Sequence, residues 1–232
     1  QELETETRRL NANGCFNDLT ASFGCALLDS AIIDGICRAT DQGLQGAIKT
    51  NALGLGEEFS TLLPVAPSRH VNVRHTVGLI DPLRNEELSE PLADGLPQSL
   101  EEVIDTYGIR WFKLKTSANQ EEVLARLREV NALLTEKLGT GNFRITIDAN
   151  EQFQTPGDFL SFLQVFGSAD DLSDFREQVL WIEQPLQRDA ALKEEFAEEI
   201  REINRRIPII IDESNGTDDA FEAAVRLGYR GV

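Results

Sequence analysis

Four short runs rich in β-branched and aromatic residues constrain the fold of this chain most strongly. Each run ends in charge and lies beside a longer segment of helical periodicity. The charged residues that end the runs are Lys115, Asp148, Glu183 and Asp212, separated by 33, 35 and 29 residues. One strand with its crossover helix takes about 30 residues. Strands that alternate with helices at this period predict an α/β fold with a parallel sheet.

The strand ends also predict a functional site, because the active site of a β/α barrel lies at the C-terminal ends of its strands. Alternate residues of a strand face opposite sides, so Lys113 and Lys115 share one face while Phe112 and Leu114 take the other. The same parity separates Asp148 from the apolar residues of its run. If the apolar sets face the helices, two lysines and three carboxylates converge. Buried charges in that number require mutual pairing or a metal ion.

The order of segments predicts a partial barrel. Residues 19–39 predict an amphipathic helix, and the Gly- and Pro-containing residues 40–68 connect it to the first strand. Residues 69–232 predict strands near positions 73, 113, 146, 181, 210 and 231, two fewer than a closed (β/α)8 TIM-like barrel contains. Ser99 and Gly108 are expected to bound a helix, and further helices are expected over residues 190–206 and 218–227.

Composition narrows the classes of partner. The formal net charge is −18, from 40 acidic and 22 basic residues, which argues against nucleic acid or an anionic membrane surface. We find no uninterrupted run of 18 apolar residues and no charged-then-apolar leader, so we expect no membrane span, no signal peptide and a cytoplasmic location. Cys15, Cys25 and Cys37 lack paired spacing and are expected to be reduced thiols.

The acidic residues at three successive strand ends offer only oxygen ligands. Asp148, Glu183 and Asp212 would therefore suit Mg²⁺, which also keeps positions open for water or substrate. Each residue has an alternative role when taken alone. Asp148 could cap the following turn, Glu183 could be an ordinary strand-end acid, and Asp212 with Ser214 could cap a helix. Capping does not readily explain why all three acids fall at the same end of successive strands, beside a strand that carries two lysines.

The two lysines predict proton transfer. A lysine with an ordinary pKa of about 10.4 is protonated at pH 7, but a second ammonium and a nearby divalent cation both disfavour the charged form. Lys115 is nearer the C-terminal end of its strand, so we assign it the proton transfer, and Lys113 the perturbing and positioning role. Two alternatives are lysines extending from an exposed strand and a barrel aldolase with a Schiff base on Lys115. His75 is a candidate substrate contact, although its parity also allows a structural place on a covered face.

The motifs Lys-x-Lys (113–115), Asp-x-Asn (148–150), Glu-Gln-Pro (183–185) and Asp-Glu-Ser (212–214), at these spacings, resemble the enolase superfamily. Within it they are similar to the mandelate racemase and muconate-lactonizing group, in particular its muconate-lactonizing and dipeptide-epimerase branch. The resemblance covers about residues 70–232. It implies Mg²⁺-dependent abstraction of the proton α to a carboxylate, through a metal-stabilised enediolate. Racemisation, epimerisation, cycloisomerisation or dehydration would then follow.

The resemblance also implies site roles. Asp148, Glu183 and Asp212 would be metal ligands, Lys115 an acid/base supported by Lys113, and Asn150 a residue close to the substrate. The implied partner is a small-molecule carboxylate, and a homo-oligomer is expected.

Two departures from the family pattern lead us to expect an incomplete form of such an enzyme. Residues 1–68 could represent only the C-terminal part of the family's N-terminal α+β capping domain and its linker. The branch carries a second acid/base lysine on the sixth strand, shortly after the position where Val232 ends this chain. A non-catalytic relative or fragment that only binds metal is therefore a further alternative.

Overall fold

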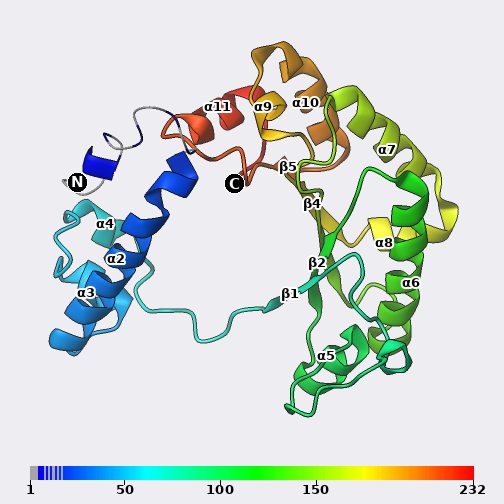
Figure 1. The fold of residues 1–232 in the computed structure, drawn as a ribbon, viewed down its shortest axis with the longest axis horizontal. Coiled ribbons are helices and arrows are strands. Elements are labelled where there is room, and N and C mark those ends of the chain that lie inside the picture. The colour runs from blue at the N-terminus through cyan, green and yellow to red at the C-terminus, as the bar shows by residue number, and fades with distance from the viewer. Residues whose placement is uncertain (1–4, 8, 10, 12–13, 15, 17) are drawn as a thin grey trace. The chain divides into compact units, whose positions relative to one another are not determined.

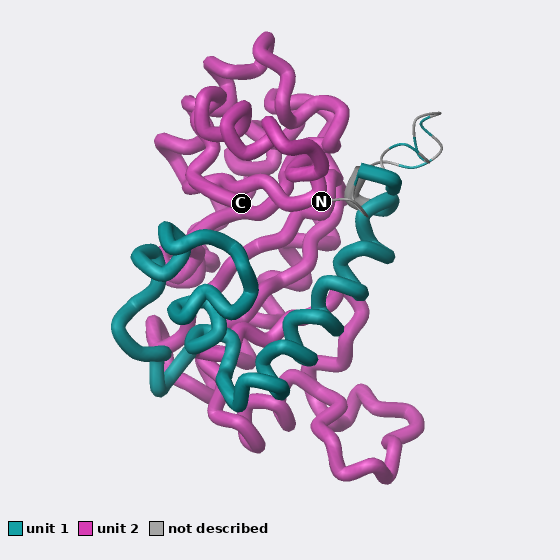
Figure 2. Tube along the Cα trace, turned by 90° about the vertical axis from the view of Figure 1, so that its left-hand side faces the viewer, with its two compact units in different colours: residues 1–71 teal, residues 72–232 magenta. Residues whose placement is uncertain are grey.

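The computed structural model describes the chain except for residues 1–4, 8, 10, 12–13, 15 and 17. The described residues form two compact units, residues 1–71 and residues 72–232 (Figure 2). The sequence-based boundary, between residues 68 and 69, lies three residues earlier. Cys25 and Cys37 are free thiols in the first unit, while Cys15 lies outside the described residues.

The regular structure of the first unit over its described part is helical, with turns and irregular segments between the helices. It contains α2 (Asp18–Ala39), α3 (Leu44–Lys49) and α4 (Glu58–Leu62), and α2 matches the helix predicted for residues 19–39. Large apolar residues of this amphipathic helix are exposed: Phe23 is 65% exposed and Leu27 is 60% exposed.

Helix α2 is the one helix of the described chain whose length and composition would allow it to cross a membrane. Residues Thr20–Ala39 have a mean hydropathy of 1.3, and none of this stretch is buried. Asp29 and Asp34 interrupt this stretch, so it is not an uninterrupted apolar run. Core helices of soluble proteins and signal sequences meet the same criterion, so the helix by itself assigns no location.

The second unit is built on a parallel sheet of five strands in the order β1-β2-β3-β4-β5 (Figure 1). The strands are β1 (Arg74–Val77), β2 (Trp111–Lys115), β3 (Arg144–Asp148), β4 (Val179–Glu183) and β5 (Ile209–Ile210). Strand order follows chain order, as expected for successive β/α units. The predicted α/β fold with a parallel sheet is therefore confirmed.

Helices occupy each connection between neighbouring strands. They are α5 (Leu100–Tyr107), α6 (Gln120–Leu138), α7 (Pro156–Ser168), α8 (Ser173–Arg176), α9 (Arg188–Ala191) and α10 (Ala197–Arg206), followed after β5 by α11 (Ala220–Leu227). Short 3₁₀ turns lie at Asn85–Glu87, Asp170–Leu172 and Glu194–Phe196. Helices α5, α6 and α7 lie along one face of the sheet (Figure 1).

The structure departs from the predicted elements at two places. The helix expected over residues 190–206 is divided, because the backbone at Lys193 is extended and the carbonyl of Ala191 accepts the buried hydroxyl of Tyr229 instead of a helical N–H. The sixth strand expected near residue 231 is not formed as a strand. The N–H of Arg230 still donates to Ile209 O at 2.9 Å, so this segment begins to pair beside β5.

The core lies between the sheet and its helices. Phe112, Ile145 and Ile182, from the central strands, are completely buried, as the alternation of apolar residues predicts. Helix α7 adds a row of phenylalanines, in which Phe159 and Phe162 stack with ring centroids 6.1 Å apart. Burial of this apolar face holds the strands in the register that positions their C-terminal ends.

Tyr229→Phe should lower the free energy of unfolding by about 1–3 kcal/mol, because it leaves the carbonyl of Ala191 buried without its donor. Tyr229 is only 4% exposed, and its hydroxyl lies 3.0 Å from Ala191 O. Urea unfolding measures the change. The matched control is Tyr107→Phe, because Tyr107 is 57% exposed and its hydroxyl should contribute less than about 0.5 kcal/mol. Equal changes at the two tyrosines would contradict this account of the helix break.

Candidate active site at the strand ends

The register of the sheet brings the predicted lysines and acids together. Lys115 pairs laterally with Asp148, and Asp148 pairs with Glu183. Laterally paired residues of a parallel sheet point to the same face. All three side chains therefore lie on the face of the sheet opposite the one that the helices cover. The sequence places charge at each strand end, and the register aligns these charges across β2, β3 and β4.

The charged side chains form a continuous chain of ion pairs. Lys113 Nζ lies 2.7 Å from both Asp148 Oδ2 and Glu183 Oε1, and Lys115 Nζ lies 2.6 Å from Asp148 Oδ2. The Asp148 side chain is fully buried and that of Glu183 is 7% exposed, whereas Lys113 and Lys115 are 15% and 30% exposed. The acids are therefore the buried partners, and Lys115 is the cation most open to a substrate.

The surroundings shift the pKa values of Asp148 and Glu183 in opposite directions. Burial opposes ionisation of Asp148, but hydrogen bonds from Lys113 and Lys115 outweigh it and hold its pKa below the ordinary value. Burial raises the pKa of Glu183, which Lys113 only partly offsets while the carboxyl groups of Asp148 and Asp212 add to the increase. Burial also works against the charge of Lys113, yet its two carboxylate partners raise its pKa. Lys113 is therefore held as an ammonium.

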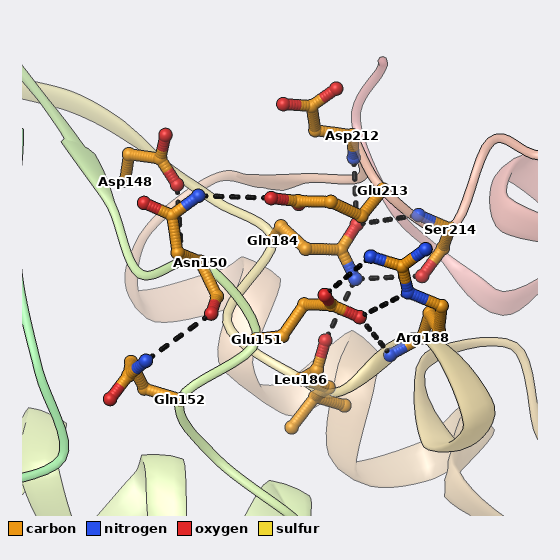
Figure 3. A network of polar contacts seen from close by, with 10 residues as sticks. All are labelled: Asp148, Asn150, Glu151, Gln152, Gln184, Leu186, Arg188, Asp212, Glu213 and Ser214. Atoms are coloured by element: carbon orange, nitrogen blue, oxygen red, sulfur yellow. Dashed lines mark hydrogen bonds and ion pairs between the residues drawn. The ribbon is translucent and has the colours of Figure 1, made fainter. Parts of the chain in front are cut away.

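Asn150 connects Lys115 to a further acid. Its Oδ1 lies 2.6 Å from Lys115 Nζ. Its Nδ2 donates to Glu213 Oε1 at 2.9 Å, and its backbone N–H donates to Asp148 Oδ1 at 3.0 Å (Figure 3). The amide is thus oriented by an acceptor on one side and an ammonium on the other. Sequence reasoning assigned no role to Glu213, although it stands in the Asp-Glu-Ser motif beside Asp212.

The third predicted ligand, Asp212, lies after β5 and is exposed, unlike Asp148 and Glu183. No group of three or more His, Cys, Asp or Glu side chains within the described part of the chain is arranged to hold a metal ion. The donor chemistry nevertheless fits Mg²⁺, because every acid at the strand ends offers oxygen. Lys113 balances the charge of the two buried carboxylates in this structure, and the ligand roles stay a prediction.

His75 is not brought to this cluster. It pairs laterally with Phe112, so its ring faces the helix side of the sheet and not the side that carries Lys113. Burial lowers its pKa, and the nearby charge of Asp81 offsets this effect only in part. The role of His75 as a substrate contact therefore stays a prediction, away from the other candidate residues.

A second ion pair joins the loops that follow β3 and β4. The carboxylate of Glu151 accepts from the backbone N–H of Arg188 at 2.8 Å and from its guanidinium at 2.8 and 2.7 Å (Figure 3). Glu151 has a φ of +64°, a left-handed conformation that non-glycine residues rarely adopt. The pair with Arg188 therefore helps to hold the loop that carries Asn150.

Glu151→Gln should lose stability only where the carboxylate is charged. Hydrogen bonds from Arg188 lower the pKa of Glu151 below its unfolded value of about 4.3. The contribution is therefore fully present above that unfolded pKa and is lost as pH falls through the folded pKa. The melting temperatures of wild type and variant should differ above about pH 5 and converge in more acidic solution. Exposed Glu177→Gln is the control, and a gap that persists in acid would contradict the prediction.

The comparison with protein families agrees with the sequence motifs. Residues 95–232, more than half of the chain, match the family described as enolase C-terminal domain-like. No curated protein matches. Among solved structures, the crystal structure of an N-succinyl Arg/Lys racemase from Bacillus cereus ATCC 14579 is similar, with 21% identity and a TM-score of 0.45. The match covers 67% of this chain but only 34% of the racemase, so this chain spans about a third of its length.

Proposed function

The chain belongs to the enolase C-terminal domain-like family, and from this premise we propose that it abstracts the proton α to a carboxylate in a Mg²⁺-dependent reaction. The observation that carries the proposal is the chain of ion pairs Lys115–Asp148–Lys113–Glu183 at the ends of three adjacent strands. An active site of β/α units is expected at this end of the sheet. Perturbed acids and bases gathered there are typical of catalysis.

Lys115 is the group that moves the proton. Its ammonium is held at 2.6 Å by both Asp148 and Asn150, which fixes its direction while it stays more exposed than Lys113. A general acid or base must reach the reacting proton before its pKa matters, and Lys115 is better placed for this than Lys113. Lys113 stays protonated between Asp148 and Glu183, where it neutralises buried charge and keeps both carboxylates in place.

Asp148, Glu183 and Asp212 are the residues that would hold Mg²⁺. The bound ion would supply positive charge for the substrate carboxylate as that group gains electron density. The oxygen-only donor set and the burial of Asp148 and Glu183 support this assignment. The finer reaction type that we propose is racemisation or epimerisation, with cycloisomerisation and dehydration as alternatives.

We further propose the setting of the whole enzyme. The partner is a small-molecule carboxylate and not nucleic acid or membrane, the enzyme is cytoplasmic, and it assembles from identical subunits. Residues 1–68 would belong to the capping domain. The net charge of −18 supports the exclusion of nucleic acid.

A binding-only relative is the second candidate, because Lys113 pairs with the carboxylates that Mg²⁺ would require. Calorimetric titration with Mg²⁺ and deuterium exchange at the α-carbon of amino-acid, dipeptide and sugar-acid substrates in D₂O distinguish the two. Metal uptake with exchange supports the enzyme, and uptake without exchange supports the binding protein. A folded chain that takes up no Mg²⁺ contradicts both. Borohydride trapping of a carbonyl substrate on Lys115 would instead indicate the aldolase alternative.

A further inference from the structure

Gln184 makes an unusually complete set of hydrogen bonds next to the candidate ligands. It follows Glu183 at the end of β4, and its side chain is fully buried. Its Oε1 accepts the backbone N–H groups of Asp212 at 2.7 Å and Ser214 at 3.1 Å. Its Nε2 donates to Leu186 O and Ser214 Oγ, both at 2.7 Å (Figure 3). Both donor positions and both acceptor positions of the amide are therefore used.

These bonds fasten the turn that carries Asp212 to the strand that carries Glu183. Strand β5 ends at Ile210, so its parallel pairing with β4 stops before Asp212. Beyond that point the contact from β4 to the backbone of Asp212 is the side chain of Gln184. One buried amide thus links the end of β4, beside the candidate ligand Glu183, to the backbone of the candidate ligand Asp212 just after β5.

The backbone of Gln184 supports the same conclusion. Its φ of +39° lies in the left-handed region, which residues other than glycine rarely adopt. Such a conformation persists only where the surrounding structure determines it strongly. Here the N–H of Gln184 donates to Ile210 O, and its carbonyl accepts the N–H of Glu151, both at 2.9 Å. This conformation aims the side chain under the turn at Asp212 and not toward solvent.

We propose that Gln184 is a positioning residue that places Asp212 against Glu183 and so sets the affinity of the site for a divalent cation. The role of the cation rests on the proposed function, whereas the positioning of Asp212 rests on the hydrogen bonds of Gln184. Replacing a residue that hydrogen-bonds to a metal ligand and orients it typically lowers metal affinity by about 10–100-fold. Gln184 acts through the backbone of Asp212 and touches no reacting group.

The test uses the full chain with Mg²⁺ as the probe. Gln184→Met keeps the length of the side chain but removes all four hydrogen bonds. We expect its Mg²⁺ affinity by calorimetry to fall about 10–100-fold while circular dichroism remains that of wild type. Ser214→Ala is the matched control, because it removes one acceptor of Nε2 and leaves both backbone bonds to Oε1. Its affinity should stay within about threefold of wild type, since Asp212 keeps its anchor.

A second readout separates the positioning from the metal. Hydrogen exchange of the Asp212 amide should accelerate in Gln184→Met but not in Ser214→Ala, whether or not Mg²⁺ binds. If wild type takes up no Mg²⁺, the proposed function fails, while faster amide exchange in the variant still supports the positioning role. If Gln184→Met does not fold, Gln184→Glu retains the acceptor oxygen and should keep the Asp212 amide protected. Unchanged Mg²⁺ affinity in folded Gln184→Met, or an Asp212 amide that stays protected, would overturn the inference.

Discussion

Asp148→Asn should reduce Mg²⁺ affinity by at least about 100-fold and α-proton exchange by about 1,000-fold or more. The substitution keeps the shape of the side chain and removes one negative charge. Asp148 is fully buried, and its Oδ2 is the atom that both Lys113 and Lys115 contact. No other carboxylate on the described part of the chain is shown to pair with both lysines, so no neighbour can replace it.

The reason for so large an effect lies in the charge balance. Two ammonium groups and two carboxylates meet here, and the variant leaves two ammonium groups with Glu183 alone. An uncompensated buried charge costs about 3–5 kcal/mol. The surplus positive charge would also repel a divalent cation. The change therefore weakens the binding of Mg²⁺ and the orientation of Lys115 together.

Three measurements check this prediction: calorimetry with Mg²⁺, deuterium incorporation in D₂O, and urea unfolding. Asp174→Asn, at an exposed position in α8, is the control and should change none of them appreciably. Glu183→Gln should also weaken metal binding strongly, but it leaves the pairs between Asp148 and the lysines intact. A folded Asp148→Asn protein that binds Mg²⁺ as wild type does would remove Asp148 from the proposed site.

The sheet could be predicted because its signals are local. Alternation of apolar residues in a run such as Phe143, Ile145 and Ile147 requires no knowledge of distant residues, and all three are buried. The division of the helix over residues 190–206 could not be predicted in this way. It depends on a contact between Ala191 and Tyr229, which are 38 positions apart. Helical periodicity alone continues through the break.

The candidate site shows the same limit. Parity placed Lys113, Lys115, Asp148 and Glu183 on one face, and the register of the sheet brings them into contact. The partners of each charge could not be predicted, because they depend on side-chain rotamers and on loop conformation. The hydrogen bond from the Asp212 amide to Gln184 depends on the left-handed backbone conformation of Gln184, which the sequence does not predict.

Lys113→Met should destabilise the metal-free chain by about 3 kcal/mol and increase the stabilisation that Mg²⁺ provides. The Lys113 ammonium lies 2.7 Å from a carboxylate oxygen of each buried acid. Its removal leaves Asp148 and Glu183 as neighbouring negative groups without the cation between them. A divalent cation would then bind without competing against the ammonium, so its affinity for the folded state should rise.

Lys137→Met is the matched control for this substitution. Lys137 also bridges two carboxylates, at 3.0 Å from Glu101 and 2.7 Å from Asp105, but these acids are 21% and 57% exposed, and pairs with exposed partners contribute about 0–1 kcal/mol. Thermal unfolding with and without Mg²⁺ compares the variants with wild type. We expect the largest Mg²⁺-induced increase in melting temperature for Lys113→Met. An equal increase in Lys113→Met and wild type would show that the ammonium does not occupy the place of the cation, because removing a competitor must strengthen binding.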